Sequence, residues 1–86
     1  MGGDDIGEQA REALRRIQLA VEQAGARLED VLRTRMFSTE ISRREKVGRA
    51  HAEVFAEIRP ASSMVEVRRL IDPALLVEIE AESGVR

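Results

Sequence analysis

Three carboxylates near the end of the chain have the spacing that would place them on one face of a β-strand. Glu78, Glu80 and Glu82 alternate with apolar residues in the segment Leu75–Glu82. A strand rises about 3.4 Å per residue, so neighbouring carboxylates would lie about 7 Å apart. Two interpretations stay open. The row is either a solvated or ion-paired sheet face, or a face covered by another subunit, where a partly desolvated carboxylate could transfer protons.

The single histidine, His51, is a weaker candidate for chemistry. It lies beside the apolar stripe of an expected helix, and the chain has no second histidine and no cysteine. Zinc sites and Ser-His-Asp triads both need partners that this sequence does not supply. We therefore interpret His51 as a surface or boundary residue and expect no metal site.

The composition restricts the classes of partner. The 86 residues carry a net charge of −2 with both signs interspersed, and aromatic residues make up only 2 %. This pattern argues against binding to nucleic acid or to a membrane surface, and no apolar run is long enough to span a bilayer. We expect one domain over residues 1–86 and a cytoplasmic location. A chain this short exposes much apolar surface, which favours an oligomer.

Two amphipathic helices are expected to hold the candidate residues in place. Asp5 followed by Glu8 resembles a capping box, and apolar residues then recur at spacings of three and four until Gly25 ends the first helix. A second helix is expected to begin near Ser42 and to end at Arg59, because Pro60 disfavours helical geometry in the preceding residue.

Three strands are expected beside these helices. The segment Val31–Thr39 alternates, with Leu32, Thr34 and Met36 on one face and Arg33 and Arg35 on the other. The segments Ser63–Leu70 and Leu75–Glu82 also alternate, and the break at Ile71–Ala74 is short enough for a hairpin. The predicted order is α-β-α-β-β, with the first two strands parallel and the last two forming the hairpin.

The same residues resemble a known family along nearly the whole chain, from about Asp5 to Ala81. The blocks DIGEQAREALRRIQLAVEQAGARLEDVLRTRMFSTE, AEVFAEIRPASSMVEVRRL and ALLVEIEA are similar to those of the RidA (YjgF) family, whose members are also called endoribonuclease L-PSP or translation initiation inhibitors. The resemblance implies an α+β, chorismate-mutase-like subunit with two helices on one face of a mixed sheet. It also implies a homotrimer with ligand clefts between subunits.

The activity implied by the resemblance is hydrolysis of 2-imino or 2-enamino acids to ammonia and a 2-keto acid, without a cofactor. Glu78 corresponds to the glutamate that positions water, and is the expected catalytic residue. Ser62 stands where the family signature PARS has an arginine that binds the substrate carboxylate. Arg59 and Met64, which flank Ser62, are the other expected substrate-binding residues.

Two departures from the family shape the functional expectation. A serine hydroxyl gives one neutral hydrogen bond where a guanidinium gives two charge-assisted ones. The family's N-terminal strands, which add residues to the cleft, are also expected to be missing. The leading hypothesis is a trimeric protein that binds a small carboxylate and has impaired deaminase activity. The alternatives are a working deaminase that uses Arg59 or another arginine, and a ribonuclease or translation inhibitor, which the composition disfavours.

Overall fold

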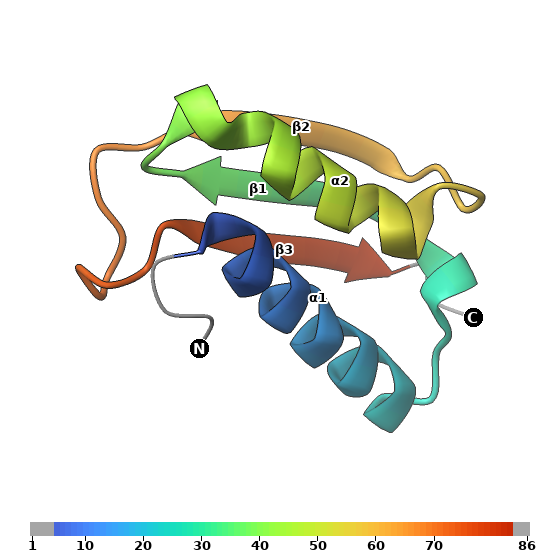
Figure 1. The fold of residues 1–86 in the computed structure, drawn as a ribbon. Coiled ribbons are helices and arrows are strands. Elements are labelled where there is room, and N and C mark those ends of the chain that lie inside the picture. The colour runs from blue at the N-terminus through green and yellow to red at the C-terminus, as the bar shows by residue number, and fades with distance from the viewer. Residues whose placement is uncertain (1–4, 84–86) are drawn as a thin grey trace.

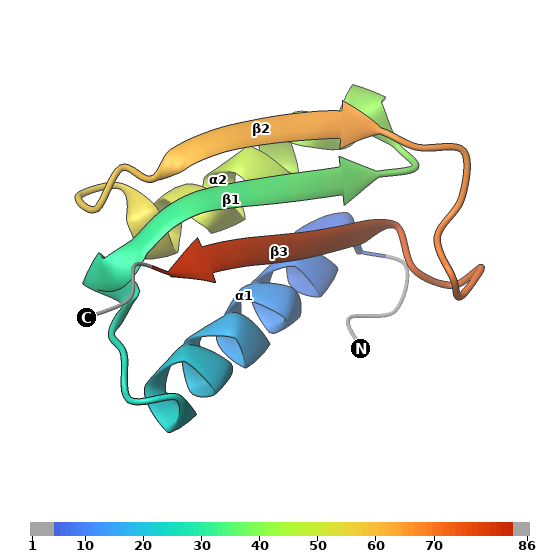
Figure 2. The ribbon, with the colours of Figure 1, turned by 180° about the vertical axis from the view of Figure 1, so that it is seen from behind.

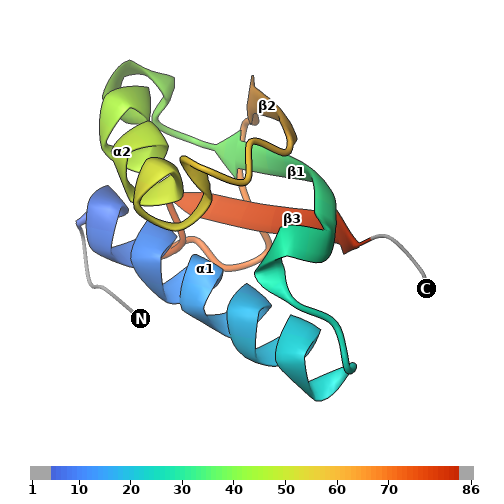
Figure 3. The ribbon, with the colours of Figure 1, turned by 90° about the vertical axis from the view of Figure 1, so that its right-hand side faces the viewer.

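Two helices cover one face of a three-stranded sheet (Figures 1 and 3). The computed structural model describes residues 5–83. Two short 3-10 turns, Leu28–Asp30 and Ile41–Arg43, precede the first strand and the second helix. The main elements, in chain order, are α1 (Ile6–Gln23), β1 (Val31–Ser38), α2 (Arg44–Phe55), β2 (Ala61–Glu66) and β3 (Val77–Ser83). The predicted α+β class and the order α-β-α-β-β are confirmed.

The strands have the spatial order β2-β1-β3, so β1 lies in the centre. β1 runs parallel to β2, as predicted, and antiparallel to β3. The predicted hairpin between the last two strands is wrong, because both pair with β1 and not with each other. The sequence break at Ile71–Ala74 is only part of a longer connection that crosses from one edge of the sheet to the other (Figure 2). This arrangement gives the central strand backbone partners on both sides.

The ends of α1 follow the sequence signals. The Asp5 carboxylate accepts hydrogen bonds from the backbone N–H groups of Gly7 and Glu8, at 2.8 and 3.2 Å. The Glu8 carboxylate pairs with Arg11 at 2.7 Å, so only one half of the expected capping box is seen at these side chains. Gly25 has a φ of 83°, which glycine adopts at little cost after a helix.

The second helix ends earlier than predicted. α2 stops at Phe55 and a turn follows, in which the Arg59 N–H donates to the Phe55 carbonyl at 2.9 Å. Arg59 itself has a φ of 55°, in the left-handed region that residues other than glycine seldom occupy. Pro60 disfavours right-handed helical geometry at Arg59, so the helix cannot continue into β2 and the chain turns at Arg59 instead.

The core lies between the helices and the sheet. Each fully buried Val, Leu, Ile or Phe side chain contributes about 1.5–3 kcal/mol relative to an exposed one, so this layer supplies most of the driving force for folding. Its buried apolar members are Ile6, Ala10, Leu14, Val21, Val31, Met36, Val47, Ala50, Phe55, Val77 and Ile79.

The opposite face of the sheet carries no helix (Figure 2). Leu32 was predicted to share one face with Thr34 and Met36, which are buried, but it is 63 % exposed while Val31 is buried. The cause is a register shift in β1 between Val31 and Arg33, which reverses the alternation at the start of the strand.

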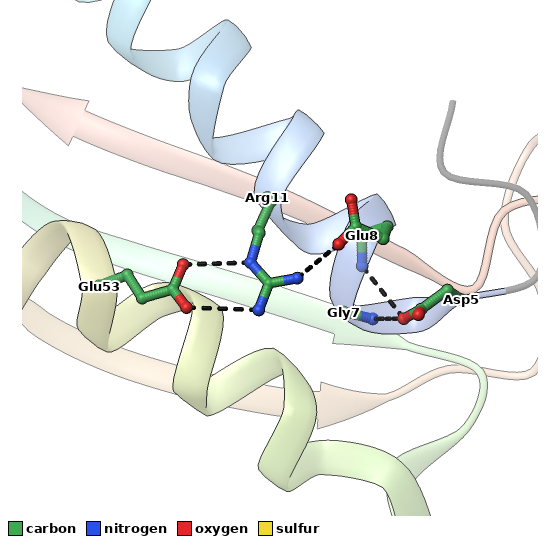
Figure 4. A network of polar contacts seen from close by, with 5 residues as sticks. All are labelled: Asp5, Gly7, Glu8, Arg11 and Glu53. Carbon is green, nitrogen blue, oxygen red and sulfur yellow. Dashed lines mark hydrogen bonds and ion pairs between the residues drawn. The ribbon is translucent and has the colours of Figure 1, made fainter.

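An ion pair joins the two helices on their outer side (Figure 4). The guanidinium of Arg11 donates to both carboxylate oxygens of Glu53, at 3.1 and 3.3 Å, and also to Glu8. The hydrogen bonds from Arg11 hold the pKa of the Glu53 carboxyl below its usual value. This contact links the exposed sides of α1 and α2, whose packing is set by the buried core residues.

Candidate functional site

The expected site residues lie on the two outer strands of the sheet. Ser62 and Met64 belong to β2, Arg59 lies just before that strand, and Glu78 belongs to β3. The central strand β1 separates the two groups.

Glu78 projects from the open face. Val77 and Ile79, its neighbours in β3, are buried, and the cross-strand partner of Glu78 is Phe37. The other two carboxylates of the row lie opposite arginines, with Glu80 at 2.9 Å from Arg35 and Glu82 at 3.0 Å from Arg33. No ion pair of Glu78 is seen within residues 5–83. The expected ion-paired sheet face therefore describes two of the three carboxylates, and Glu78 is exposed without such a partner.

Ser62 lies on the face that the helices cover, although it is at the edge of the sheet. Its hydroxyl is 3.0 Å from the hydroxyl of Thr34, its cross-strand partner, and donates to the Pro60 carbonyl at 3.2 Å. Thr34 is fully buried and is in turn 2.9 Å from Nε2 of His51 on α2. The position that corresponds to the signature arginine thus ends a chain of polar contacts that begins in the second helix.

Neither the contact of His51 with Thr34 nor that of Thr34 with Ser62 was expected from the sequence. His51 is half-buried, as a boundary residue should be, and its ring packs on that of Phe55 with centroids 4.8 Å apart. Burial lowers the pKa of His51 below its ordinary value, which favours the neutral imidazole. A signal for this contact was present in the sequence, because a threonine on the buried face of a strand needs a hydrogen-bonding partner.

The other two expected residues are placed differently from each other. Met64 packs against the edge of the core on the helix side, so its side chain is partly used by the fold. Arg59 is exposed at the turn before β2 and keeps its unusual backbone conformation. A non-glycine residue at positive φ costs of the order of 1 kcal/mol, and such strain is often found at functional positions.

One chain does not bring Glu78 and Ser62 together. In the pairing register, Ser62 lies level with Thr34 and Ala81, whereas Glu78 lies level with Phe37 and Val65. The two residues are therefore on different outer strands, at different heights and on opposite faces of the sheet. A site within one chain therefore cannot use both residues.

A hollow of about 360 Å³ lies between α1 and β3. It is lined on the side of α1 by Ala13, Arg16, Ile17 and Ala20, and on the other side by Leu75, Val77, Glu78 and Ile79. Within residues 5–83 there is no cluster of His, Asp or Glu that could hold a metal ion. No helix among the same residues is long and apolar enough to cross a membrane.

Comparison with known proteins gives consistent matches. The profile of the Endoribonuclease L-PSP family matches residues 1–83. A RutC family protein of Pyrococcus horikoshii is 38 % identical over 77 residues, which are 90 % of this chain and 60 % of that protein. The 2-iminobutanoate/2-iminopropanoate deaminase of Salmonella typhimurium is 33 % identical over 81 residues, covering 91 % of this chain and 62 % of the enzyme. The chain thus spans about three fifths of the length of these relatives.

Solved structures show the same fold. A member of the YjgF/YER057c/UK114 family from Mycobacterium tuberculosis superposes with a TM-score of 0.93 at 60 % identity, over 96 % of this chain and 70 % of the other. The YjgF gene product of E. coli superposes with a TM-score of 0.87 at 33 % identity, over 95 % and 66 % of the two chains. These matches confirm the chorismate-mutase-like arrangement implied by the sequence resemblance.

Proposed function

From the premise that the chain belongs to the endoribonuclease L-PSP family, also named RidA or YjgF, we propose that it is a subunit of a homotrimer that binds a small carboxylic acid between subunits. The ligand is a 2-imino or 2-keto acid. Glu78 of one subunit and Ser62 of its neighbour face this ligand, and deaminase activity is impaired. Neither a metal nor a cofactor takes part.

The observation that carries this proposal is the separation of Glu78 from Ser62 within one chain. Both correspond to functional positions of the family, yet β1 and opposite sheet faces divide them. An assembly in which the β2 edge of one subunit meets the open face of the next would bring the two together. The open face carries apolar side chains suited to such a contact, since Leu32 and Val65 are exposed there.

The impairment follows from the chemistry at position 62. The ligand carboxylate loses hydrating water when it binds. The guanidinium of an arginine would compensate for this loss with two charge-assisted hydrogen bonds. Ser62 offers one neutral hydroxyl in that place. The loss is about 2–3 kcal/mol of binding free energy, on the scale of hydrogen bonds to charged groups.

The alternative is a working deaminase in which Arg59 supplies the missing cation. The exposure of Arg59 beside β2 and its strained backbone favour this possibility. The relative named 2-iminobutanoate/2-iminopropanoate deaminase supports the same reaction class.

Release of ammonia from 2-iminopropanoate generated in situ separates the two functions. We expect little acceleration by the natural chain. Acceleration that is lost in both Glu78→Ala and Arg59→Ala would favour the working enzyme instead. Glu80→Ala is the matched control for Glu78→Ala, because it removes a carboxylate from the same face of the same strand.

Two further measurements test the proposed site. Sedimentation velocity is expected to give the mass of a trimer, and a stable monomer would rule out a cleft between subunits. Ser62→Arg is expected to tighten pyruvate binding by about tenfold or more, as a gained charge-assisted contact predicts. Unchanged pyruvate affinity in this variant would exclude position 62 from the ligand site.

A further inference from the structure

A line of three polar side chains runs from the second helix to the edge of the sheet. It begins at Nε2 of His51, passes through the hydroxyl of Thr34 at 2.9 Å, and reaches the hydroxyl of Ser62 at 3.0 Å. The Ser62 hydroxyl continues to the Pro60 carbonyl at 3.2 Å. The middle member is fully buried and the last is exposed, so the line connects the interior to the proposed ligand site.

The number of available protons decides the direction of these hydrogen bonds. Thr34 and Ser62 each have one hydroxyl proton, whereas the Pro60 carbonyl can only accept. If Ser62 donates to Pro60, it accepts from Thr34, and Thr34 then needs a proton donated by His51 Nε2. All three contacts are hydrogen bonds in this direction. In the reverse direction Ser62 donates to Thr34 and Thr34 donates to His51, which leaves the contact with Pro60 without a proton.

We propose that His51 and Thr34 form a hydrogen-bond relay that fixes the Ser62 hydroxyl as a donor, so that position 62 binds a carboxylate or carbonyl oxygen of the ligand and disfavours an amine. This inference rests on the proposed function, because it assigns a ligand group to the same site. His51 and Thr34 are positioning residues in this relay, and Ser62 is the residue that touches the ligand. A ligand oxygen would replace the Pro60 carbonyl as the acceptor.

The surroundings of the relay favour control by the imidazole tautomer over control by charge. Burial lowers the pKa of His51 and thus favours the neutral ring, which carries one proton on either Nδ1 or Nε2. No charged group contributes to that shift within residues 5–83. The charged residues of the neighbouring elements are Arg33 and Arg35 of β1, which pair with Glu82 and Glu80 on the other face, Glu66 at the end of β2, and Arg44, Glu45, Lys46, Arg49 and Glu53 on α2.

The tautomer can be read directly, because His51 is the only histidine in the chain. Nitrogen-15 NMR of the ligand-free protein at pH 7.5 is expected to show the proton on Nε2. Ser62→Ala is expected to shift the Nε2 signal, whereas Ser63→Ala, the adjacent serine on the other face of β2, should leave it unchanged. A proton on Nδ1, or an Nε2 signal indifferent to Ser62→Ala, would overturn the relay.

Binding of pyruvate tests the role of the relay in recognition. Thr34→Val, which removes the hydroxyl and keeps the shape, is expected to weaken pyruvate binding about three- to tenfold, the effect of one neutral hydrogen bond. His51→Phe should weaken binding similarly, and His51→Gln should restore it, because the glutamine amide can donate to Thr34.

The outcomes separate the two proposals. If the natural chain binds pyruvate and both Thr34→Val and His51→Phe bind it equally well, the relay has no role in recognition while the proposed function stands. If propylamine binds more tightly than pyruvate, the assigned direction is wrong. If pyruvate does not bind even when the proton is on Nε2, the ligand site itself is wrong, and the proposed function fails together with the role of the relay.

Discussion

The two faces of the sheet differ in the side chains that the central strand β1 contributes to them. On the covered face, β1 contributes Thr34 and Met36 to a dry layer in which no side-chain nitrogen or oxygen is left without a hydrogen bond, within the part of the chain that the structure describes. On the open face, the same strand presents Arg33, Arg35 and Phe37 beside the carboxylates of β3. The covered face therefore specifies the fold, whereas the side chains of the open face are not needed for the core.

The two phenylalanines give the sharpest contrast between the faces. They are the only Phe, Tyr or Trp residues in the chain, and Phe55 is 2 % exposed on the covered side whereas Phe37 lies on the open side. Phe55→Ala is expected to lower the free energy of unfolding by about 3–5 kcal/mol, measured by urea denaturation followed by circular dichroism.

Phe37→Ala is the matched comparison. Its effect should be small at low protein concentration and should grow with concentration if the open face is covered by another subunit, because association stabilises the folded chain by mass action. If both variants lose the same unfolding free energy at every protein concentration, Phe37 is as important to the single folded chain as Phe55 is.

Gln9 tests whether the covered side also holds the long connection before β3. Its buried side-chain amide donates to the Ala74 carbonyl at 3.1 Å and accepts from the Leu76 N–H at 2.7 Å. Gln9→Ala is expected to cost about 1–3 kcal/mol, because it leaves these backbone groups without that partner. Gln9→Glu keeps the acceptor but removes the donor to Ala74 and buries a carboxylate, so at pH 7 it should cost at least as much in the same denaturation experiment. If Gln9→Ala costs nothing, the connection is held by other contacts.

The ion pairs of the open face should contribute less to the free energy of unfolding than the hydrogen bonds of Gln9. Arg35 and Glu80 are 44 % and 51 % exposed in the single chain, and such pairs contribute about 0–1 kcal/mol because solvent screens them. We expect Arg35→Ala to change the unfolding free energy by no more than this under dissociating conditions. A double-mutant cycle with Glu80→Ala isolates the pair, and a coupling well above this range would show that the face is shielded from water.

The smallest expected effect is a pH dependence at the outer surface of the helices. The Glu53 pKa is lowered by its hydrogen bonds to Arg11, so its contribution is complete above the unfolded value of 4.5 and is lost as the pH falls through the folded pKa. Glu53→Gln should therefore flatten the stability profile below about pH 5. Unfolding free energies measured at a series of pH values, with Glu57→Gln as the control, test this prediction. If Glu53→Gln and the natural chain have identical profiles, the Arg11–Glu53 pair does not contribute to the pH dependence of stability.

The fold was largely predictable from local signals. The apolar periodicity of α1 and the Asp5 and Gly25 signals place its ends nearly where they lie, and the alternation of Val31–Thr39 gives β1 within one residue. The error concerns which strands are neighbours. Alternation indicates a strand, but it carries no information about the partner, and a short turn-like break between two strands favoured the hairpin that the structure replaces with a crossing over β1.

The candidate site was predictable only as a set of residues. Resemblance to the family picked out Glu78 and Ser62, but their opposite faces follow from strand order and register, which no single segment encodes. The exposure of Leu32 depends on a local register shift, and the contact of His51 with Thr34 depends on how α2 crosses the sheet. Such features arise from tertiary packing, which overrides local pattern.

The central place of β1 also governs how the sheet can form in time. Thr34 meets Ser62 across 28 positions of the chain, and Arg33 meets Glu82 across 49. Neither pairing can begin from a local turn. The chain therefore loses the entropy of closing a long loop before either strand pair can form. We expect the helices to form early, β2 to join through α2, and β3 to dock last. Until that last step, one edge of β1 remains open to pairing with other chains, and the refolding yield should fall as protein concentration rises.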